Sequence, residues 1–223
     1  MRRVAALLMV GVVAMVASAG TAVAQRGMSS MPEMRGVWNP VVGAGGAYEF
    51  DNNGKKQQIE FAVVGKEDVQ GKEGYWLEFT AQSERGGVVS KTLIVVDGDD
   101  THIARMVVQP AGQSPIELPA QMMAMQHKSP QPADIRKYAK DLGKETITTP
   151  AGTFSCEHMQ MNDGKADVWV SPQVPPYGLV KSVSKENGTM MLVKVETNAQ
   201  DKITGTPRMI NPMAMGAMGG HPQ

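Results

Sequence analysis

Alternating apolar and polar residues, interrupted by turn-forming pairs, are the feature that most constrains the fold of this chain. Residues 59–63 and 75–81 each place apolar side chains at every second position, which is typical of strands with one buried face. Asn52-Asn53-Gly54 and Asp97-Gly98 stand beside such segments, and Gly and Asn tolerate the positive φ of tight hairpin turns. The sequence therefore predicts antiparallel hairpins.

The same signals recur along most of the chain. Further strands are predicted at about 88–96, 103–108, 144–149, 153–161, 165–170, 178–184 and 189–197. The predicted fold class is thus mainly β, with an antiparallel sheet of about ten or eleven strands. A twisted open sheet of that width tends to curl or close. We expect a curled half-barrel.

The middle of the chain changes period. Apolar residues recur at i, i+4 and i+7 from Leu118, and at i, i+3, i+4 and i+7 from Ile135. This spacing predicts two short helices, over 118–127 and 132–142, and Gly143 suits the position just after a helix. We expect both helices to lie on the concave face of the half-barrel.

The first 24 residues have the three parts of a secretory signal peptide. Arg2 and Arg3 precede an apolar run, and Ala22-Val23-Ala24 form a cleavage site. The run is shorter than the roughly 20 residues that span a bilayer. We expect cleavage near Ala24 and a periplasmic or secreted protein with no transmembrane segment in the mature chain. Beyond the signal, we predict a flexible arm over 25–45, the β domain over 46–198 and a disordered Met/Gly-rich tail over 199–223.

Composition and the absence of certain motifs argue against several classes of function. The 22 basic and 22 acidic residues balance, so nothing indicates a nucleic-acid partner. The single cysteine, Cys156, excludes an internal disulfide and a lipid anchor just after the cleavage site. No G-x-S-x-G, P-loop or dinucleotide fingerprint is present, so the chain is expected not to be an enzyme and to hold no cofactor.

Soft metal ligands cluster in one predicted strand. Cys156 and His158 share one face of it, and Met159 and Met161 share the other, so the four cannot enclose one ion. A buried thiol and a core or rim histidine are the favoured interpretation. Trp169 alternates with acidic residues and is expected on the outer face or in a mouth.

Methionine supplies the alternative function. Thioether sulfur selects Cu(I), and Met213, Met215, Met218 and His221 lie within nine residues near the C-terminus. The alternative hypothesis is therefore a periplasmic Cu(I)-binding protein that uses its Met-rich segments. No folded site is predicted around these residues, so a low-complexity tail rich in methionine also accounts for them.

Three segments carry a resemblance to a known family. They are Thr148–Cys156, Asp167–Ser171 and Pro176–Lys181, and they resemble bacterial envelope proteins of the LolA/LolB-like lipoprotein carrier superfamily. The close resemblance covers about 35 residues, and the rest agrees in the order of elements. It implies an eleven-stranded half-barrel, and in the carriers its cavity binds acyl chains of lipoproteins in transit. Unlike the receptor member, this chain has no cysteine to carry a lipid.

The leading hypothesis is a non-enzymatic envelope protein that binds an apolar ligand, such as a lipid or an acylated protein. Two short helices are too small to fill the concave face of so wide a sheet, so an apolar cleft is expected there. Its predicted lining consists of Ile59, Phe61, Tyr75, Leu77, Phe79, Leu118, Met122, Met125, Ile135 and Tyr138.

Overall fold

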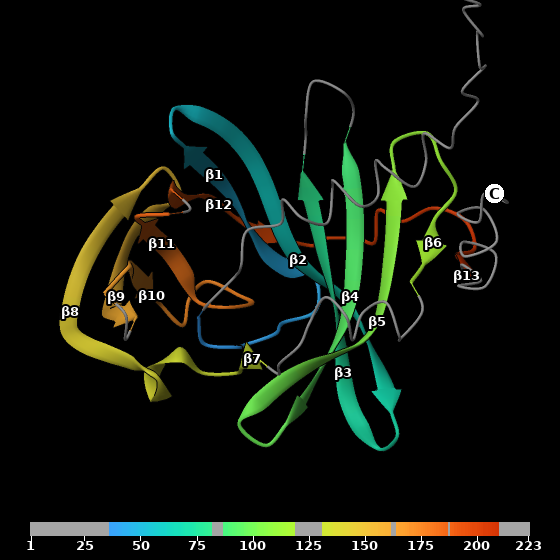
Figure 1. Ribbon diagram of the computed structural model, residues 1–223, viewed down its shortest axis with the longest axis horizontal. Helices are drawn as coiled ribbons and strands as arrows, with labels where there is room; N and C mark the ends of the chain where they lie inside the picture. Colours follow the sequence, from blue (N-terminus) through green and yellow to red (C-terminus); the bar gives the residue numbers. More distant parts are fainter. Residues whose placement is uncertain (1–35, 82–86, 119–130, 162–163, 187, 210–223) are drawn as a thin grey trace, which may run out of the picture. The chain divides into compact units, whose positions relative to one another are not determined.

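The computed structural model describes residues 36–81, 87–118, 131–161, 164–186 and 188–209. Most of them belong to one sheet (Figure 1). Its first strands are β1 (Ala44–Asn52), β2 (Lys55–Val69), β3 (Lys72–Ala81), β4 (Val88–Asp97), β5 (Asp100–Pro110), β6 (Ile116–Glu117) and β7 (Gln131–Pro132). The short 3₁₀ helix η1 (Ile135–Lys137) follows. The remaining strands are β8 (Ala139–Thr149), β9 (Gly152–Met161), β10 (Ala166–Val170), β11 (Leu179–Ser184), β12 (Gly188–Thr197) and β13 (Arg208–Met209).

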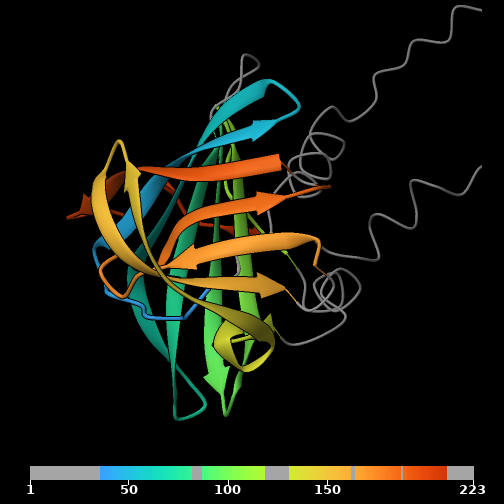
Figure 2. The same ribbon diagram turned by 90° about the vertical axis from the view of Figure 1, so that its left-hand side faces the viewer.

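The strand order shows how the two parts of the chain join. It runs β13-β6-β5-β4-β3-β2-β1-β12-β11-β10-β9-β8, and β7 pairs with β5. Neighbours are antiparallel except β13 and β6, which are parallel. The pairing of β1 with β12 therefore links the strands before residue 118 to those after residue 138. In Figure 2 the strands β8–β12 run across β2–β5. The prediction of a mainly β fold with a wide antiparallel sheet is confirmed in the described residues, where the sheet is open; the curled half-barrel stays a prediction.

One face of β1–β5 is apolar. Residues directly opposite one another on neighbouring strands share a face, and the register places Tyr48 opposite Ile59, Phe61 opposite Phe79, and Leu77 opposite Thr92. We call this the apolar face; it carries Tyr48, Ile59, Phe61, Leu77, Phe79, Met106 and Val108, all buried. The alternate residues, among them Trp76, Glu78 and Lys91, form the opposite face.

A C-terminal segment crosses that opposite face. Residues 198–207, which we call the strap, leave β12 and end in β13 beside β6. Lys202 Nζ donates to Glu60 Oε1 at 2.6 Å, and Thr204 N donates to Gln109 Oε1 at 2.9 Å. The tail predicted from residue 199 is thus ordered as far as Met209, because side chains of β2–β5 satisfy its polar groups. Residues 210–223 lie outside the described residues.

The helix predicted over 132–142 is wrong. Over 132–142 the chain forms only η1, after which β8 begins at Ala139 and continues to Thr149. Gly143, expected to end a helix, sits at a β-bulge with φ of 102°. The helix predicted over 118–127 lies outside the described residues except for Leu118. No helix within the described ranges has the length and apolarity to cross a bilayer.

Candidate ligand-binding site

The apolar face brings four of the predicted lining residues together. Ile59, Phe61, Leu77 and Phe79 are 2%, 1%, 6% and 4% exposed. The rings of Phe61 and Phe79 lie 5.1 Å apart between centroids, and Tyr48, which the prediction missed, meets Phe61 edge-on at 6.1 Å. Aromatic pairs in these geometries contribute about 0.5–1.5 kcal/mol beyond the area they bury. The face is a packed aromatic and aliphatic surface.

Tyr48 joins the apolar face to the second half of the sheet. Its hydroxyl donates a 3.0 Å hydrogen bond to the carbonyl of Leu179 in β11, although β12 lies between β1 and β11. Burial raises the pKa of the Tyr48 phenol, so the hydroxyl stays a donor. The contact joins β1 to β11 across the intervening strand β12.

An aromatic cluster lies at one end of the row of β3 side chains on the apolar face, which we call the β3 column. Trp38 packs against Tyr75 at 6.3 Å and against Tyr177, in the loop after β10, at 4.9 Å between ring centroids. Tyr75 alternates with Leu77 and so belongs to the same face. We call Trp38, Tyr75 and Tyr177 the end cluster.

The backbone of residues 36–39 fixes the end cluster. Val37 N donates to Tyr177 O at 2.8 Å, and Trp38 N donates to Ala133 O at 2.7 Å. Gly36 is required by this close approach, because a Cβ there would lie 2.0 Å from the Tyr177 carbonyl oxygen. Part of the arm predicted to be flexible is therefore pinned between two other segments.

The Trp38 indole contains an unsatisfied donor. Its Nε1 is buried and has no hydrogen-bond partner among the described residues. A buried N–H without an acceptor costs roughly 1–3 kcal/mol, and such groups are rare. The end cluster thus offers one hydrogen-bond donor in apolar surroundings. The only sequence signal for it was an aromatic residue in a Gly- and Pro-rich segment.

The other predicted lining residues are placed unevenly. Leu118 and Ile135 are buried, at 5% and 1% exposed. Tyr138 is 44% exposed, unlike the buried residues of the apolar face. The Tyr75 hydroxyl donates to Glu73 Oε2 at 2.8 Å. Residues Met122 and Met125 lie outside the described residues, as do the alternative copper ligands Met213, Met215, Met218 and His221.

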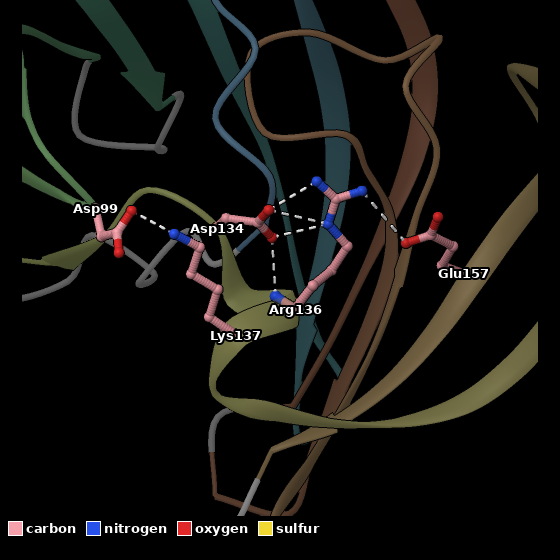
Figure 3. A network of polar contacts seen from close by, with 5 residues as sticks. All are labelled: Asp99, Asp134, Arg136, Lys137 and Glu157. Atoms are coloured by element: carbon pink, nitrogen blue, oxygen red, sulfur yellow. Dashed lines mark hydrogen bonds and ion pairs between the residues drawn. The ribbon is translucent and has the colours of Figure 1, made fainter.

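Ile135 is held by a polar network around η1 (Figure 3). The Asp134 carboxylate accepts from Arg136 N at 2.9 Å and from Arg136 Nη2 at 2.7 Å. These bonds hold the pKa of Asp134 below its ordinary value. Arg136 also reaches Glu157 of β9 at 3.7 Å, and Lys137 pairs with Asp99 at the β4–β5 turn. The network ties η1 to both parts of the sheet.

A second polar cluster lies on β8–β11. His158 stacks on Trp169 with ring centroids 4.3 Å apart, and Lys181 Nζ lies 4.7 Å from the indole centroid. Trp169 Nε1 donates to Glu145 Oε2 at 2.6 Å, and His158 Nε2 lies 3.2 Å from Asp167 Oδ1. These five residues contact one another, and the Glu145 side chain remains 51% exposed.

The neighbouring thiol is not arranged as a nucleophile. Cys156 is 1% exposed, and burial raises its pKa to about 11. A catalytic cysteine needs a depressed pKa and access to substrate. Within the described ranges no group of three or more His, Cys, Asp or Glu side chains is placed to hold a metal ion.

Comparison with known proteins adds distant structural similarity. No family model and no curated protein matches the chain. Among solved structures, it resembles a candidate lipoprotein of Parabacteroides distasonis, with 13% identity and a TM-score of 0.35, and a candidate exported protein with a YmcC-like fold from Bacteroides fragilis, with 13% identity and a TM-score of 0.37. Each similarity covers 74% of this chain and 100% of the other. At these values the similarities assign no function.

Proposed function

We propose that this chain is an exported, non-enzymatic protein that binds a lipid or an acylated protein against its apolar face. The observation that carries the proposal is the unsatisfied Trp38 N–H, held beside the apolar face. Ligand sites for such molecules are apolar surfaces with a few fixed polar groups. An acyl chain with a carboxylate or ester carbonyl offers hydrocarbon for the apolar face and an oxygen acceptor for the Trp38 N–H.

The orientation of the ligand follows from this arrangement. Its carbonyl or carboxylate oxygen accepts from Trp38 Nε1 within the end cluster. Its hydrocarbon chain extends along the β3 column toward Leu77 and Phe79. Since these side chains are already buried, binding requires them to separate from what covers them. We therefore expect an affinity in the micromolar range, with part of the apolar contact energy offset by that rearrangement.

Export is part of the same proposal. Residues 1–24 have the organisation of a cleavable signal, which places the mature chain in the periplasm or outside the cell. In the described residues, the buried Cys156 and the mutually satisfied groups around Trp169 give no nucleophile–base pair with room for a substrate. Binding without chemistry is the activity these features favour.

The test uses fatty acids brominated near the carboxylate or near the methyl end. A Trp76→Phe/Trp169→Phe chain keeps Trp38 as its single indole, and bromine quenches an indole only at close range. We expect saturable quenching at micromolar concentrations, stronger for the head-brominated probe. Absence of quenching by either probe up to solubility contradicts the proposal, and stronger quenching by the tail-brominated probe reverses the orientation.

A matched substitution tests the hydrogen bond. Trp38→Phe keeps an aromatic ring but removes the N–H, so we expect a Kd about 5–10-fold higher, as for one net hydrogen bond. Trp76→Phe, on the opposite face, is the control and should leave the Kd unchanged. The Kd is measured by displacement of a fluorescent fatty acid, and circular dichroism confirms the fold of each variant.

A further inference from the structure

Strand β8 forms an unusual edge of the sheet. Among the described residues it is the terminal strand on its side and has 11 residues, whereas the opposite edge ends in the two-residue β13. Most of its residues are exposed, including Leu142 at 42%, and Tyr138 just before it is 44% exposed. A long edge strand carries a row of backbone donors and acceptors that can pair with another strand.

The charges on this edge form a self-complementary pattern. Lys140 and Asp141 precede the midpoint between Leu142 and Gly143, and Lys144 and Glu145 follow it. Inverting the strand about this midpoint places Lys140 opposite Glu145 and Asp141 opposite Lys144. A shift by one residue either way places Lys140 opposite Lys144, or Asp141 opposite Glu145. Opposite charges across an antiparallel pair stabilise it, and like charges destabilise it.

The lysines are available for such contacts. Neither Lys140 nor Lys144 makes an ion pair within the described part of the chain, although lysines at other exposed positions, such as Lys56 and Lys66, do. Both are exposed. Edge lysines also discourage pairing when they face like charges, so the same residues oppose other registers.

The bulge makes the backbone fit this register. In a regular strand only alternate residues direct their backbone groups outward, so residues five apart, such as Lys140 and Glu145, could not be direct partners in a symmetric pair. The register shift between Asp141 and Gly143 inserts one extra residue and exchanges the alternation on its two sides. Residues on opposite sides of the bulge, such as Lys140 and Glu145, can therefore both direct their backbone groups outward and be direct partners.

The centre of the pair is sterically open. No heavy atom of the described ranges lies within 4 Å of the position of a Cβ on Gly143. In the inverted register the exposed Leu142 faces Gly143 of the partner subunit, and Tyr138 faces Ile147 of the partner subunit. Two exposed apolar side chains therefore gain cover on each copy.

From this charge pattern, the bulge and the exposed edge, we propose that β8 is a self-association surface. It pairs antiparallel with β8 of a second copy of the chain, with Lys140 opposite Glu145 of the partner subunit. The pairing joins the two sheets and leaves the apolar face of each copy in place, so it is independent of the proposed ligand.

Complementary charge variants test the surface. Lys140→Glu/Lys144→Glu makes the edge acidic, and Asp141→Lys/Glu145→Lys makes it basic. We expect the wild-type mature chain to dimerise in sedimentation velocity, each variant alone to dissociate at least 10-fold more readily, and an equimolar mixture of the two to recover the dimer. Lys55→Glu/Lys185→Glu, with the same charge change at exposed lysines elsewhere, should dimerise like the wild type.

The outcomes are decisive in either direction. The proposal is overturned if the wild-type chain stays monomeric over a 100-fold range of concentration that extends to its solubility limit. It is also overturned if the mixture remains monomeric while both variants keep the wild-type circular dichroism spectrum. Because recovery in the mixture requires both folded edges, it cannot arise from misfolding.

Cysteine pairs test the register. Ala139 lies opposite Thr146 of the partner subunit in the proposed arrangement, and Cα atoms of antiparallel partners are about 4.5–5.5 Å apart, within disulfide range. A mixture of Ala139→Cys and Thr146→Cys chains should cross-link faster than either alone. Faster cross-linking of Thr146→Cys with itself would show a different register and overturn this one.

Discussion

The backbone N–H of Lys202 donates a 2.9 Å hydrogen bond to Glu78 Oε2, joining the strap to β3 across 124 positions of sequence. The Glu78 side chain is only 2% exposed. Burial beneath the strap raises its pKa to about 7, and the nearby Asp201 carboxylate adds to the rise. The strap therefore covers a carboxyl group that titrates near neutral pH.

Glu78 should make stability depend on pH. Because its pKa in the folded chain lies above the ordinary value of 4.5, its protonated form is favoured by folding. Its stabilising effect is complete below about pH 4.5 and is lost as pH rises to about 7. Glu78→Gln removes this loss, so the variant should gain up to roughly 3 kcal/mol over the wild type between pH 4.5 and 8.

Urea unfolding at several pH values measures the difference. Glu49→Gln, at a partly exposed carboxylate of β1, is the matched control for the Glu-to-Gln change. The amide that Glu78→Gln introduces retains an oxygen for Lys202 N, so the strap contact itself is preserved. A difference between variant and wild type that does not change with pH contradicts the titration of Glu78.

The strap should contribute to global stability. Compared with a chain that ends after Met209, one that ends after Asn198 loses the bonds of Lys202 and Thr204 and uncovers Glu78. We expect a lower Tm by about 5–10 °C, as for a loss of roughly 2–3 kcal/mol in a domain of this size. Differential scanning calorimetry of the two truncated chains at pH 6 measures this. Equal Tm values would mean that the strap lies on the sheet without stabilising it.

The Cys156 thiol should be unreactive in the folded chain. It is 1% exposed, so a reagent cannot reach it in the folded chain. Burial also raises its pKa to about 11, so only a small fraction is thiolate at pH 8. A disulfide reagent should modify the native chain at least about 100-fold more slowly than the unfolded chain. In a Ser155→Cys/Cys156→Ala chain the exposed neighbouring thiol should react at nearly the unfolded rate. Equal rates for the two native proteins would contradict the burial of Cys156.

Most of the strands could be predicted because they bury one side. The alternation at residues 59–63 and 75–81 reflects the apolar face directly, and Asn53 and Gly54 have the positive φ, 55° and 82°, that the turn signal implied. Within the described ranges, ten strands of five or more residues result, in line with the expected ten or eleven. The same alternation separated Cys156 and His158 from Met159 correctly.

The strap and the first half of β8 could not be predicted, for a common reason; the second half of β8 was predicted as a strand over 144–149. Nothing in the described part of the chain covers most of β8, so its sequence shows no alternation, and the bulge at Asp141–Gly143 further disturbs its period. The apolar residues Ile135, Tyr138 and Leu142 then imitate a helical spacing by chance. The strap binds through hydrogen bonds and ion pairs, as Lys202 and Thr204 show, and such contacts leave no hydrophobic pattern in a sequence.

The arrangement of the apolar face was predicted in part. Ile59, Phe61, Leu77 and Phe79 could be assigned to one face because strand periodicity determines faces. Trp38 and Tyr177 come together only through the backbone bonds of residues 36–39, which depend on the approach allowed by Gly36. Contacts between segments so distant in sequence are set by tertiary structure, and no local pattern encodes them.

The stack of His158 on Trp169 should shield the indole ring from solvent. His158 covers one side of the indole, and Glu145 accepts its N–H at 2.6 Å. In a Trp38→Phe/Trp76→Phe chain, Trp169 is the single fluorophore. His158→Ala should expose the ring and shift its emission maximum to longer wavelength, with a loss of roughly 1 kcal/mol in the free energy of unfolding. Gln160→Ala, on the next strand position of that face, should cause no comparable shift. An unchanged emission spectrum for His158→Ala would show that other groups shield Trp169.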